Sequence, residues 1–135
     1  MSRILVIDDS RTALETVARL LIDAGHQVAA CLSARAATER LRRERFDLIV
    51  TDIFMPDMDG FEVILEQRRN GSGIPVIALS GARMARSALR AAELMGARRI
   101  LEKSRVEHDL AAAVADTLAV AAPAPAPGER GTGDS

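Results

Sequence analysis

The sequence predicts an α/β protein built on a parallel sheet with helices on both of its faces. Five short apolar segments alternate with segments of helical periodicity along the chain. Residues 48–51 are apolar or β-branched without interruption, which is typical of a strand that is covered on both faces. Strands that alternate with helices form parallel sheets with right-handed crossovers. We therefore expect a doubly wound, five-stranded parallel sheet.

Length and composition are those of one globular domain. The 135 residues are 48% hydrophobic and 27% charged, which allows a moderate core. The 18 basic and 19 acidic residues nearly cancel, so bulk charge gives no case for nucleic acid or a membrane surface. A single cysteine, Cys31, excludes an internal disulfide framework and suits a reducing compartment. With neither a long apolar span nor a leader, we expect a cytoplasmic protein.

The first two strand–helix units are marked by their caps. Residues 3–7 read as a buried strand, and Ser10 caps a helix that ends at Gly25. Residues 27–32 form a second strand, and Ser33 caps the helix after it.

The third strand, residues 47–52, is the centre of the pattern. It ends in Asp52, and a short loop leads to a helix for which Asp59 and Glu62 have capping-box spacing. Open α/β sheets bind their ligands at the carboxyl ends of the strands. A carboxylate there is costly unless something cationic or reactive meets it.

Two more units and a tail complete the chain. A fourth strand over residues 74–80 precedes a helix that ends at Gly96. A fifth strand over residues 99–102 precedes the last helix, over residues 105–120. In the helix before Gly96 we expect four buried side chains: Ala85, Ala88, Leu89 and Ala92.

The chain divides into one domain and a tail. We assign residues 1–121 to the domain and residues 122–135 to a disordered Ala/Pro-rich tail, extended by its regularly spaced prolines.

Five polar side chains stand at the carboxyl ends of the predicted strands. Parallel strands end at a common edge, so these side chains should border one crevice. They are Asp8 and Asp9 after the first strand, Asp52 on the third, Ser80 on the fourth and Lys103 after the fifth.

This set of side chains suits phosphoryl transfer. Clustered carboxylates cannot all ionise cheaply without a cation, and oxygen ligands favour Mg²⁺ where phosphate takes part. Lys103 and Ser80 would contact phosphoryl oxygens, and Asp52 would be the oxygen nucleophile that forms an aspartyl phosphate. Each residue alone has a structural interpretation, as a cap, a turn residue or a surface charge. Their occurrence at successive strand ends favours the chemical one.

On these motifs the sequence strongly resembles the receiver domain of bacterial two-component response regulators, in its stand-alone, CheY-like form. The resemblance covers residues 3–120 and rests on Asp8-Asp9, the run over residues 51–60, Ser80-Gly81 and Lys103. It implies a flavodoxin-like sheet in the order 2-1-3-4-5.

The resemblance also implies roles for the crevice residues. Asp52 would be phosphorylated by a phosphohistidine on a sensor histidine kinase or phosphotransfer protein, while Ser80 and Lys103 would bind the phosphoryl oxygens. The expected Mg²⁺ ligands are Asp9, Asp52 and the Phe54 backbone carbonyl, with Asp8 acting mainly through water. The other expected partner is an unidentified downstream protein, and we expect no nucleic acid and no membrane.

Two positions depart from the family pattern. The family usually has a cis proline after the lysine, where this chain has Ser104. A non-proline cis bond costs about 2.5–4 kcal/mol, so we expect a trans Lys103–Ser104 bond, a re-routed loop and a capping box between Ser104 and Glu107. Ile100 replaces an aromatic residue that turns inward in many members, so the output switch must use something else or be weak.

Three functions stay open on the sequence. The first is a phosphoacceptor that promotes its own phosphoryl transfer without turning over an external substrate; it would act as an output regulator, a relay intermediate or a phosphate sink. The second is a receiver-like binding module that acts without phosphorylation. The third is a Mg²⁺-dependent phosphohydrolase, but haloacid-dehalogenase enzymes carry an acid two residues after the nucleophile, where this chain has Phe54.

Overall fold

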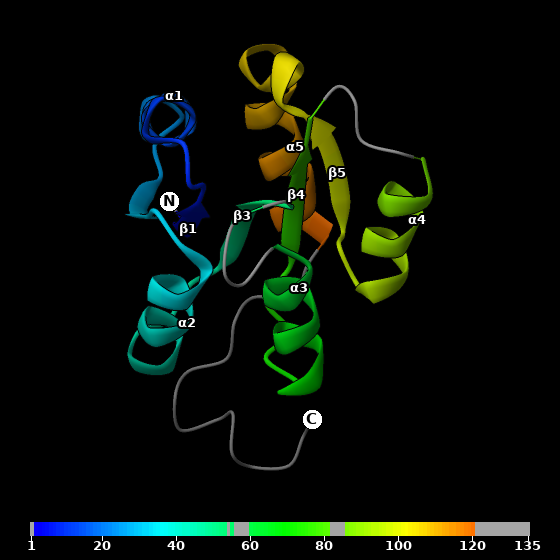
Figure 1. Ribbon diagram of the computed structural model, residues 1–135. Helices are drawn as coiled ribbons and strands as arrows, with labels where there is room; N and C mark the ends of the chain where they lie inside the picture. Colours follow the sequence, from blue (N-terminus) through cyan, green and yellow to red (C-terminus); the bar gives the residue numbers. More distant parts are fainter. Residues whose placement is uncertain (1, 54, 56–59, 82–85, 121–135) are drawn as a thin grey trace.

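The computed structural model describes residues 2–53, 55, 60–81 and 86–120. Within this part, the chain alternates strands and helices (Figure 1). The elements are β1 (Arg3–Ile7), α1 (Arg11–Asp23), β2 (Gln27–Cys31), α2 (Ala34–Arg43), β3 (Leu48–Asp52), α3 (Gly60–Arg69), β4 (Val76–Ser80), α4 (Arg86–Met95), β5 (Arg99–Glu102), the 3₁₀ turn η1 (Lys103–Arg105) and α5 (Val106–Val120). The strands form one parallel sheet in the order β2-β1-β3-β4-β5, which confirms the expected class and strand order.

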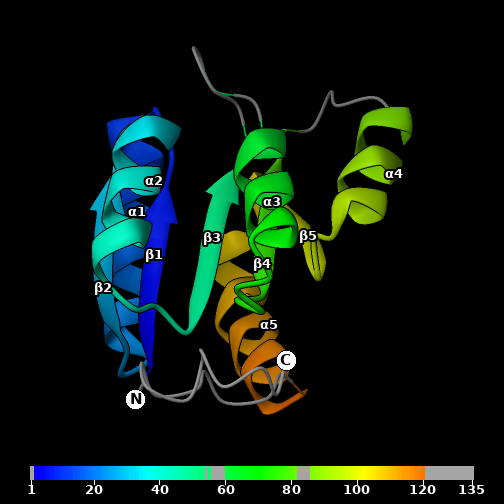
Figure 2. The ribbon, with the colours of Figure 1, turned by 90° about the horizontal axis from the view of Figure 1, so that it is seen from below.

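Helices cover both faces of the sheet. Figure 2 shows α2, α3 and α4 on one face and α1 and α5 on the other. Successive strand side chains point to opposite faces. In β1, Leu5 and Ile7 therefore join the core under α2, α3 and α4, while Ile4 and Val6 join the core under α1 and α5. Both faces need apolar side chains, which is why the strands are apolar at successive positions.

The predicted helix boundaries near the start of the chain are confirmed. The Ser10 hydroxyl accepts a hydrogen bond from the Ala13 N–H (3.3 Å), and the Ser33 hydroxyl accepts one from the Ala36 N–H (3.1 Å). Gly25 follows α1 with a φ of 97°, a left-handed conformation that glycine adopts without steric cost.

The burial expected for α4 is only partly right. Ala92 is fully buried, but Ala88 and Leu89 are half-buried and Leu94 is 63% exposed. Ala85 lies outside the described residues. The reason is position: α4 lies beside β5, the edge strand of the sheet (Figure 1), so it has less surface to cover than a central helix.

Two of the predictions for the loop after β5 have opposite outcomes. The Lys103–Ser104 bond is trans, as expected, since the described residues contain no cis peptide bond. The capping box is wrong, because Ser104 lies inside the turn η1 and its hydroxyl donates to the Glu102 carboxylate (3.3 Å). Ile100 is half-buried and packs against the core under α4.

Three other expectations fall on residues outside the described part of the chain. They concern the Asp59 cap, the Phe54 carbonyl and the tail over residues 122–135.

Gly60 is where α3 comes closest to β3. A Cβ atom on this residue would lie 2.1 Å from the Asp52 carbonyl oxygen and 2.6 Å from the Ile53 Cα. The Gly60 N–H also donates to the Ile53 carbonyl. Only a residue without a side chain fits this approach, which sets the start of α3 directly against the end of β3.

We expect Gly60→Ala to lower the free energy of unfolding by about 1–3 kcal/mol, because backbone atoms must move apart to admit the methyl group. Urea denaturation measures the change. Gly81→Ala is the matched control, since a Cβ atom there meets nothing within 4 Å. Equal denaturation midpoints for the two variants would contradict the steric argument.

Candidate functional site

The strand order brings the predicted polar residues to one edge of the sheet. Asp8 and Asp9 follow β1, Asp52 ends β3, Ser80 ends β4 and Lys103 follows β5. These four strands are consecutive neighbours in the sheet. Carboxylate oxygens of Asp8, Asp9 and Asp52 all lie within 4.8 Å of one another. The predicted convergence of these acids is therefore present in the structure.

Lys103 links the acids of two strands. Its Nζ lies 3.0 Å from Asp8 Oδ2 and 3.2 Å from Asp52 Oδ2. Asp8 is fully buried and Asp52 is 7% exposed, whereas Asp9 is exposed. The ammonium group therefore compensates the two acids that have lost most of their contact with water.

The backbone at the start of α1 fixes the orientation of Asp8. Its Oδ1 accepts a hydrogen bond from the Ser10 N–H (2.9 Å), while Oδ2 faces Lys103. Ser10 is also the N-cap of α1, so the position of the helix and that of the carboxylate are set by the same turn. This second role of Ser10 is not marked in the sequence except by its place two residues after Asp8.

Burial and charge act in opposite directions on the ionisation of the site. Burial raises the pKa of Asp52 above that of an ordinary aspartate; Lys103 opposes this effect, and the nearby Asp8 and Asp9 add to it. Burial also disfavours the charged form of Lys103, but Asp8 and Asp52 outweigh it and raise the pKa of this lysine. With three carboxylates and one ammonium group, the cluster lacks positive charge.

The residues present fit a hard divalent cation. All three clustered side chains offer carboxylate oxygens, the ligands that Mg²⁺ prefers, and the exposed Asp9 opens the cluster to solvent. A divalent ion would also supply the positive charge that Lys103 alone does not.

Ser80 reaches the same edge but makes fewer contacts there. It is buried, and it pairs in register with Glu102, the residue before Lys103. Among the described residues, its hydroxyl makes no hydrogen bond to the three acids or to Lys103. The structure thus places Ser80 near the cluster without joining it to the ion-paired group.

A cavity adjoins the ion pairs and was not identified from the sequence. It has a volume of about 370 Å³ and lies between α1 and α5. Its lining includes Asp8 and Lys103 of the ion pairs, together with Thr16 and Val17 of α1 and His108 of α5. No local sequence pattern marks this cavity, because its walls come from two helices that are distant along the chain.

Fold and site together define a class: a doubly wound sheet with an acidic, lysine-bridged cluster at the carboxyl edge. Residues 4–115 match the family model of the response regulator receiver domain. The chain therefore belongs to the response regulator receiver family. Receiver domains of this family are signalling phosphoacceptors of two-component systems, and they bind Mg²⁺ at an acidic pocket.

Known relatives agree with this assignment. A response regulator receiver protein of Anaeromyxobacter sp. is 37% identical over 103 residues, which are 76% of this chain and 43% of the relative. The sensory/regulatory protein RpfC of Xanthomonas campestris pv. campestris is 36% identical over 87% of this chain and 16% of its own length. The chain thus spans less than half the length of these curated relatives.

Solved structures show the same fold. The NarL signal receiver domain from Mycobacterium tuberculosis superimposes with a TM-score of 0.80 at 27% identity, covering 88% of this chain and 97% of that one. A receiver domain protein from Clostridium thermocellum gives a TM-score of 0.78, also at 27% identity, over 88% and 95% of the two chains.

None of the helices in the described residues has the length and apolar character needed to cross a membrane.

We expect Asp52→Asn to raise the free energy of unfolding of the metal-free protein at neutral pH. Because its pKa is raised on folding, the ionised carboxylate lowers stability above that raised pKa. The gain should shrink as the pH falls through the raised pKa of Asp52, and it should vanish below the ordinary pKa of aspartate, where Asp52 is protonated in both the folded and the unfolded state. Urea denaturation with a chelator present, at neutral and at acidic pH, measures both effects.

The control for this prediction is Asp23→Asn, which changes an exposed acid on α1. It should leave the neutral-pH midpoint nearly unchanged. A lower midpoint for Asp52→Asn than for the parent chain would show that the ion pair with Lys103 outweighs the cost of burying the charge.

Proposed function

We propose that this protein is a phosphorylation-controlled signalling protein in which Asp52 accepts a phosphoryl group from a phosphohistidine. The donor is a sensor histidine kinase or a histidine phosphotransfer protein, and the signal passes on by contact with another protein. One observation supports this most directly: Lys103 Nζ lies between Asp8 and Asp52, with Asp9 in the same cluster. All four residues lie at the carboxyl edge, where the exposed Asp9 opens the cluster to solvent.

The chemistry is a simple displacement at phosphorus. An oxygen of the Asp52 carboxylate attacks the phosphorus atom and forms an O–P bond, while the N–P bond to the donor imidazole breaks. The electron pair returns to the imidazole nitrogen. Positioning and charge neutralisation are most of what such a transfer needs, and Lys103 supplies part of both.

The acids would also hold the ion that this chemistry uses. Asp8, Asp9 and Asp52 would bind Mg²⁺, and the Phe54 carbonyl is a further expected ligand outside the described residues. When bound, the ion neutralises charge on the phosphoryl oxygens. Asp8 is buried and ion-paired, so Asp9 is the carboxylate with most freedom to adjust its coordination.

Phosphorylation would change the partners of Lys103. Esterified Asp52 carries its negative charge on phosphoryl oxygens instead of on the carboxylate oxygen that now faces the ammonium group. Lys103 would follow that charge, and Ser80 would donate its hydroxyl to another phosphoryl oxygen. A shift of Lys103 moves the end of β5 and the turn η1, and this is the segment through which the modification would be read.

The cavity between α1 and α5 is the proposed donor docking region. It is lined by Asp8 and Lys103 and by residues of both helices, so a donor that binds there would bring its phosphohistidine close to Asp52. His108 and Glu107 at its wall are polar groups that a donor would meet.

We expect acetyl phosphate with Mg²⁺ to add one phosphoryl group to the chain, and Asp52→Asn to abolish this labelling, because the amide cannot act as the nucleophile. Intact-mass spectrometry measures both. Asp47→Asn is the control, since Asp47 lies at the opposite edge of the sheet, where its carboxylate accepts a hydrogen bond from the Arg3 N–H.

Each alternative function has its own outcome in this experiment. Persistent labelling of Asp52→Asn would place the acceptor elsewhere. A chain that is not labelled at all, yet binds Mg²⁺, would favour the binding module that acts without phosphorylation. Multiple turnover of a generic phosphate ester would favour the phosphohydrolase.

We expect Asp9→Ala to weaken Mg²⁺ binding by about tenfold or more, equivalent to ~1.4 kcal/mol, because it removes the exposed carboxylate of the ligand set. Lys103 is the only lysine in the chain, so lysine labelled with ¹³C at Cε gives one side-chain NMR signal beside the site. Titration of that signal with Mg²⁺ measures the affinity. Asp23→Ala is the control, and an unchanged titration for Asp9→Ala would remove Asp9 from the ligand set.

A further inference from the structure

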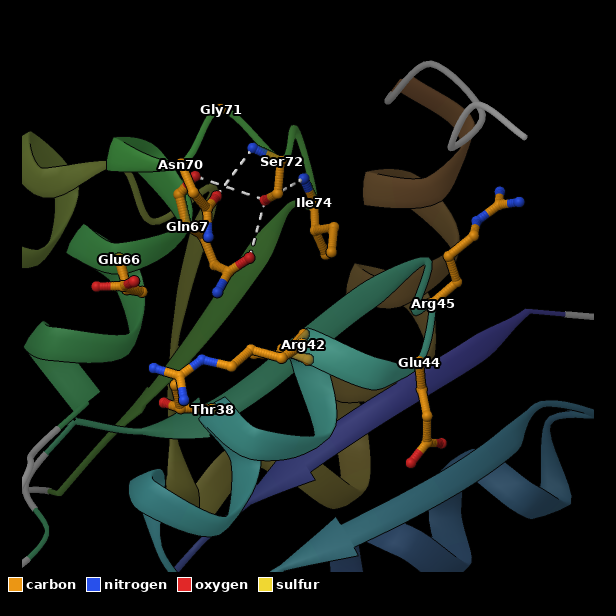
Figure 3. Close-up of a pocket in the computed structure, with 11 residues that line it drawn as sticks. Thr38, Arg42, Glu44, Arg45, Glu66, Gln67, Asn70, Gly71, Ser72 and Ile74 are labelled. Carbon is orange, nitrogen blue, oxygen red and sulfur yellow. Dashed lines mark hydrogen bonds between the residues drawn. The ribbon is translucent and has the colours of Figure 1, made fainter. Parts of the chain in front are cut away.

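A second pocket lies at the opposite edge of the sheet from Asp52. It has a volume of about 450 Å³ and is bordered by the ends of α2 and α3 and by the loops that follow them (Figure 3). Cavities of this size accommodate small organic ligands. We refer to it as the α2–α3 pocket.

Only one end of the Gln67 side-chain amide has a hydrogen-bond partner among the described residues. The residue is buried, at 6% exposure, and its Oε1 accepts a hydrogen bond from the Ser72 hydroxyl (2.8 Å). Its Nε2 donates to no residue in the described ranges. Figure 3 shows this amide nitrogen directed between the two helices, toward Arg42 and Thr38. A buried amide therefore presents two N–H donors to the pocket.

The loop after α3 holds this amide in place. The Ser72 N–H donates to Asn70 Oδ1 (3.0 Å), and the Ser72 hydroxyl accepts from the Ile74 N–H (3.3 Å). Because Ser72 is fixed by both bonds, its contact with Gln67 Oε1 fixes which way the Gln67 nitrogen points. The donor is thus pre-oriented before any ligand arrives.

Arg42 adds a positive charge close to this donor. In Figure 3 its side chain extends along α2 below Gln67. No ion pair joins Arg42 to a carboxylate of the described residues. Arginine near the end of a helix is also explained by the helix dipole. That explanation does not extend to the Gln67 amide, which faces the same space.

The acids of the pocket do not cancel this charge. The Glu44 carboxylate is bound by the guanidinium groups of Arg3 and Arg40. The Glu66 carboxylate points away from the Gln67 amide in Figure 3. Between these two acids, the donors of Gln67 and Arg42 face a space that is bounded on its apolar side by Leu41 and Ile74.

We propose that the α2–α3 pocket binds a small organic anion, a carboxylate or a phosphate monoester with a compact apolar body. The anion accepts hydrogen bonds from Gln67 Nε2 and from the Arg42 guanidinium, and the apolar body packs on Leu41 and Ile74. This site is separate from the acidic cluster and does not depend on phosphorylation of Asp52.

The test uses the side-chain amides as reporters. The chain has three of them, on Gln27, Gln67 and Asn70, and only the last two line the pocket. The ¹⁵N-labelled chain, residues 1–135, is titrated with phenyl phosphate, with benzoate and with neutral phenol, at constant ionic strength. We expect saturable shifts of the Gln67 and Asn70 signals with at least one anion, no shift with phenol and an unmoved Gln27 signal.

Two variants test the donors. Arg42→Gln should weaken the anion about tenfold or more, whereas the neighbouring Arg43→Gln, which changes an exposed arginine outside the pocket, should leave the affinity unchanged. Gln67→Leu should abolish the shift of the Asn70 signal. Tighter binding of phenyl phosphate than of benzoate would assign the site to phosphate monoesters, and the reverse to carboxylates.

Three results would overturn the proposal. They are the absence of a saturable shift with either anion, an equal response to phenol, and an Arg42→Gln variant that binds as the parent chain does. The Asp52→Asn variant should give the same titration as the parent chain, so a failure here is distinct from a failure of phosphorylation.

Discussion

The contact of Lys103 with Asp8 and Asp52 is the interaction on which the candidate site depends. Two buried carboxylates from β1 and β3 face one ammonium group that follows β5, at 3.0 and 3.2 Å. Without that group, the two acids would be buried without a partner, which proteins avoid at high cost. The order β1-β3-β4-β5 brings these three strand ends within reach of one lysine. The charge pairing at this edge therefore depends on the order of the strands in the sheet.

Backbone contacts hold the central acid as firmly as its charge partners do. Thr51 is fully buried, and its hydroxyl donates to the Asp52 carbonyl (2.9 Å). Gly60 lies directly against the same carbonyl. Asp52 thus has a fixed backbone and a carboxylate that meets Lys103, so a change of charge on the side chain acts on the lysine and not on β3. We therefore expect β5 and η1 to be the segments that respond to a change of charge on Asp52.

The sequence was sufficient wherever a local pattern decides the outcome. Continuous apolar runs located the strands, Ser10 and Ser33 located helix starts, and polar residues at four of the five strand ends located the acidic cluster. It was insufficient wherever distant neighbours decide. The periodicity of α4 gave its inward face but not the edge position that leaves Leu94 exposed. The capping pattern at Ser104 failed because Glu102 competes for the hydroxyl, and nothing local marks Gln67 as a pocket residue.

The two edges of the sheet differ in how completely their charges are paired. At the amino edge, hydrogen bonds from Arg40 and Arg3 hold the pKa of Glu44 at about 2, and Arg3 also stacks on the Phe46 ring, 4.7 Å from its centroid. Two arginines, Arg3 and Arg40, pair with the one carboxylate of Glu44. Arg42 has no carboxylate partner among the described residues. At the carboxyl edge, three acids share Lys103. An edge that lacks positive charge attracts a cation, and a guanidinium group without a carboxylate partner attracts an anion. The helix α3 extends from one edge to the other, from Gly60 beside Asp52 to Gln67 at the second pocket, so the two sites lie near opposite ends of one helix.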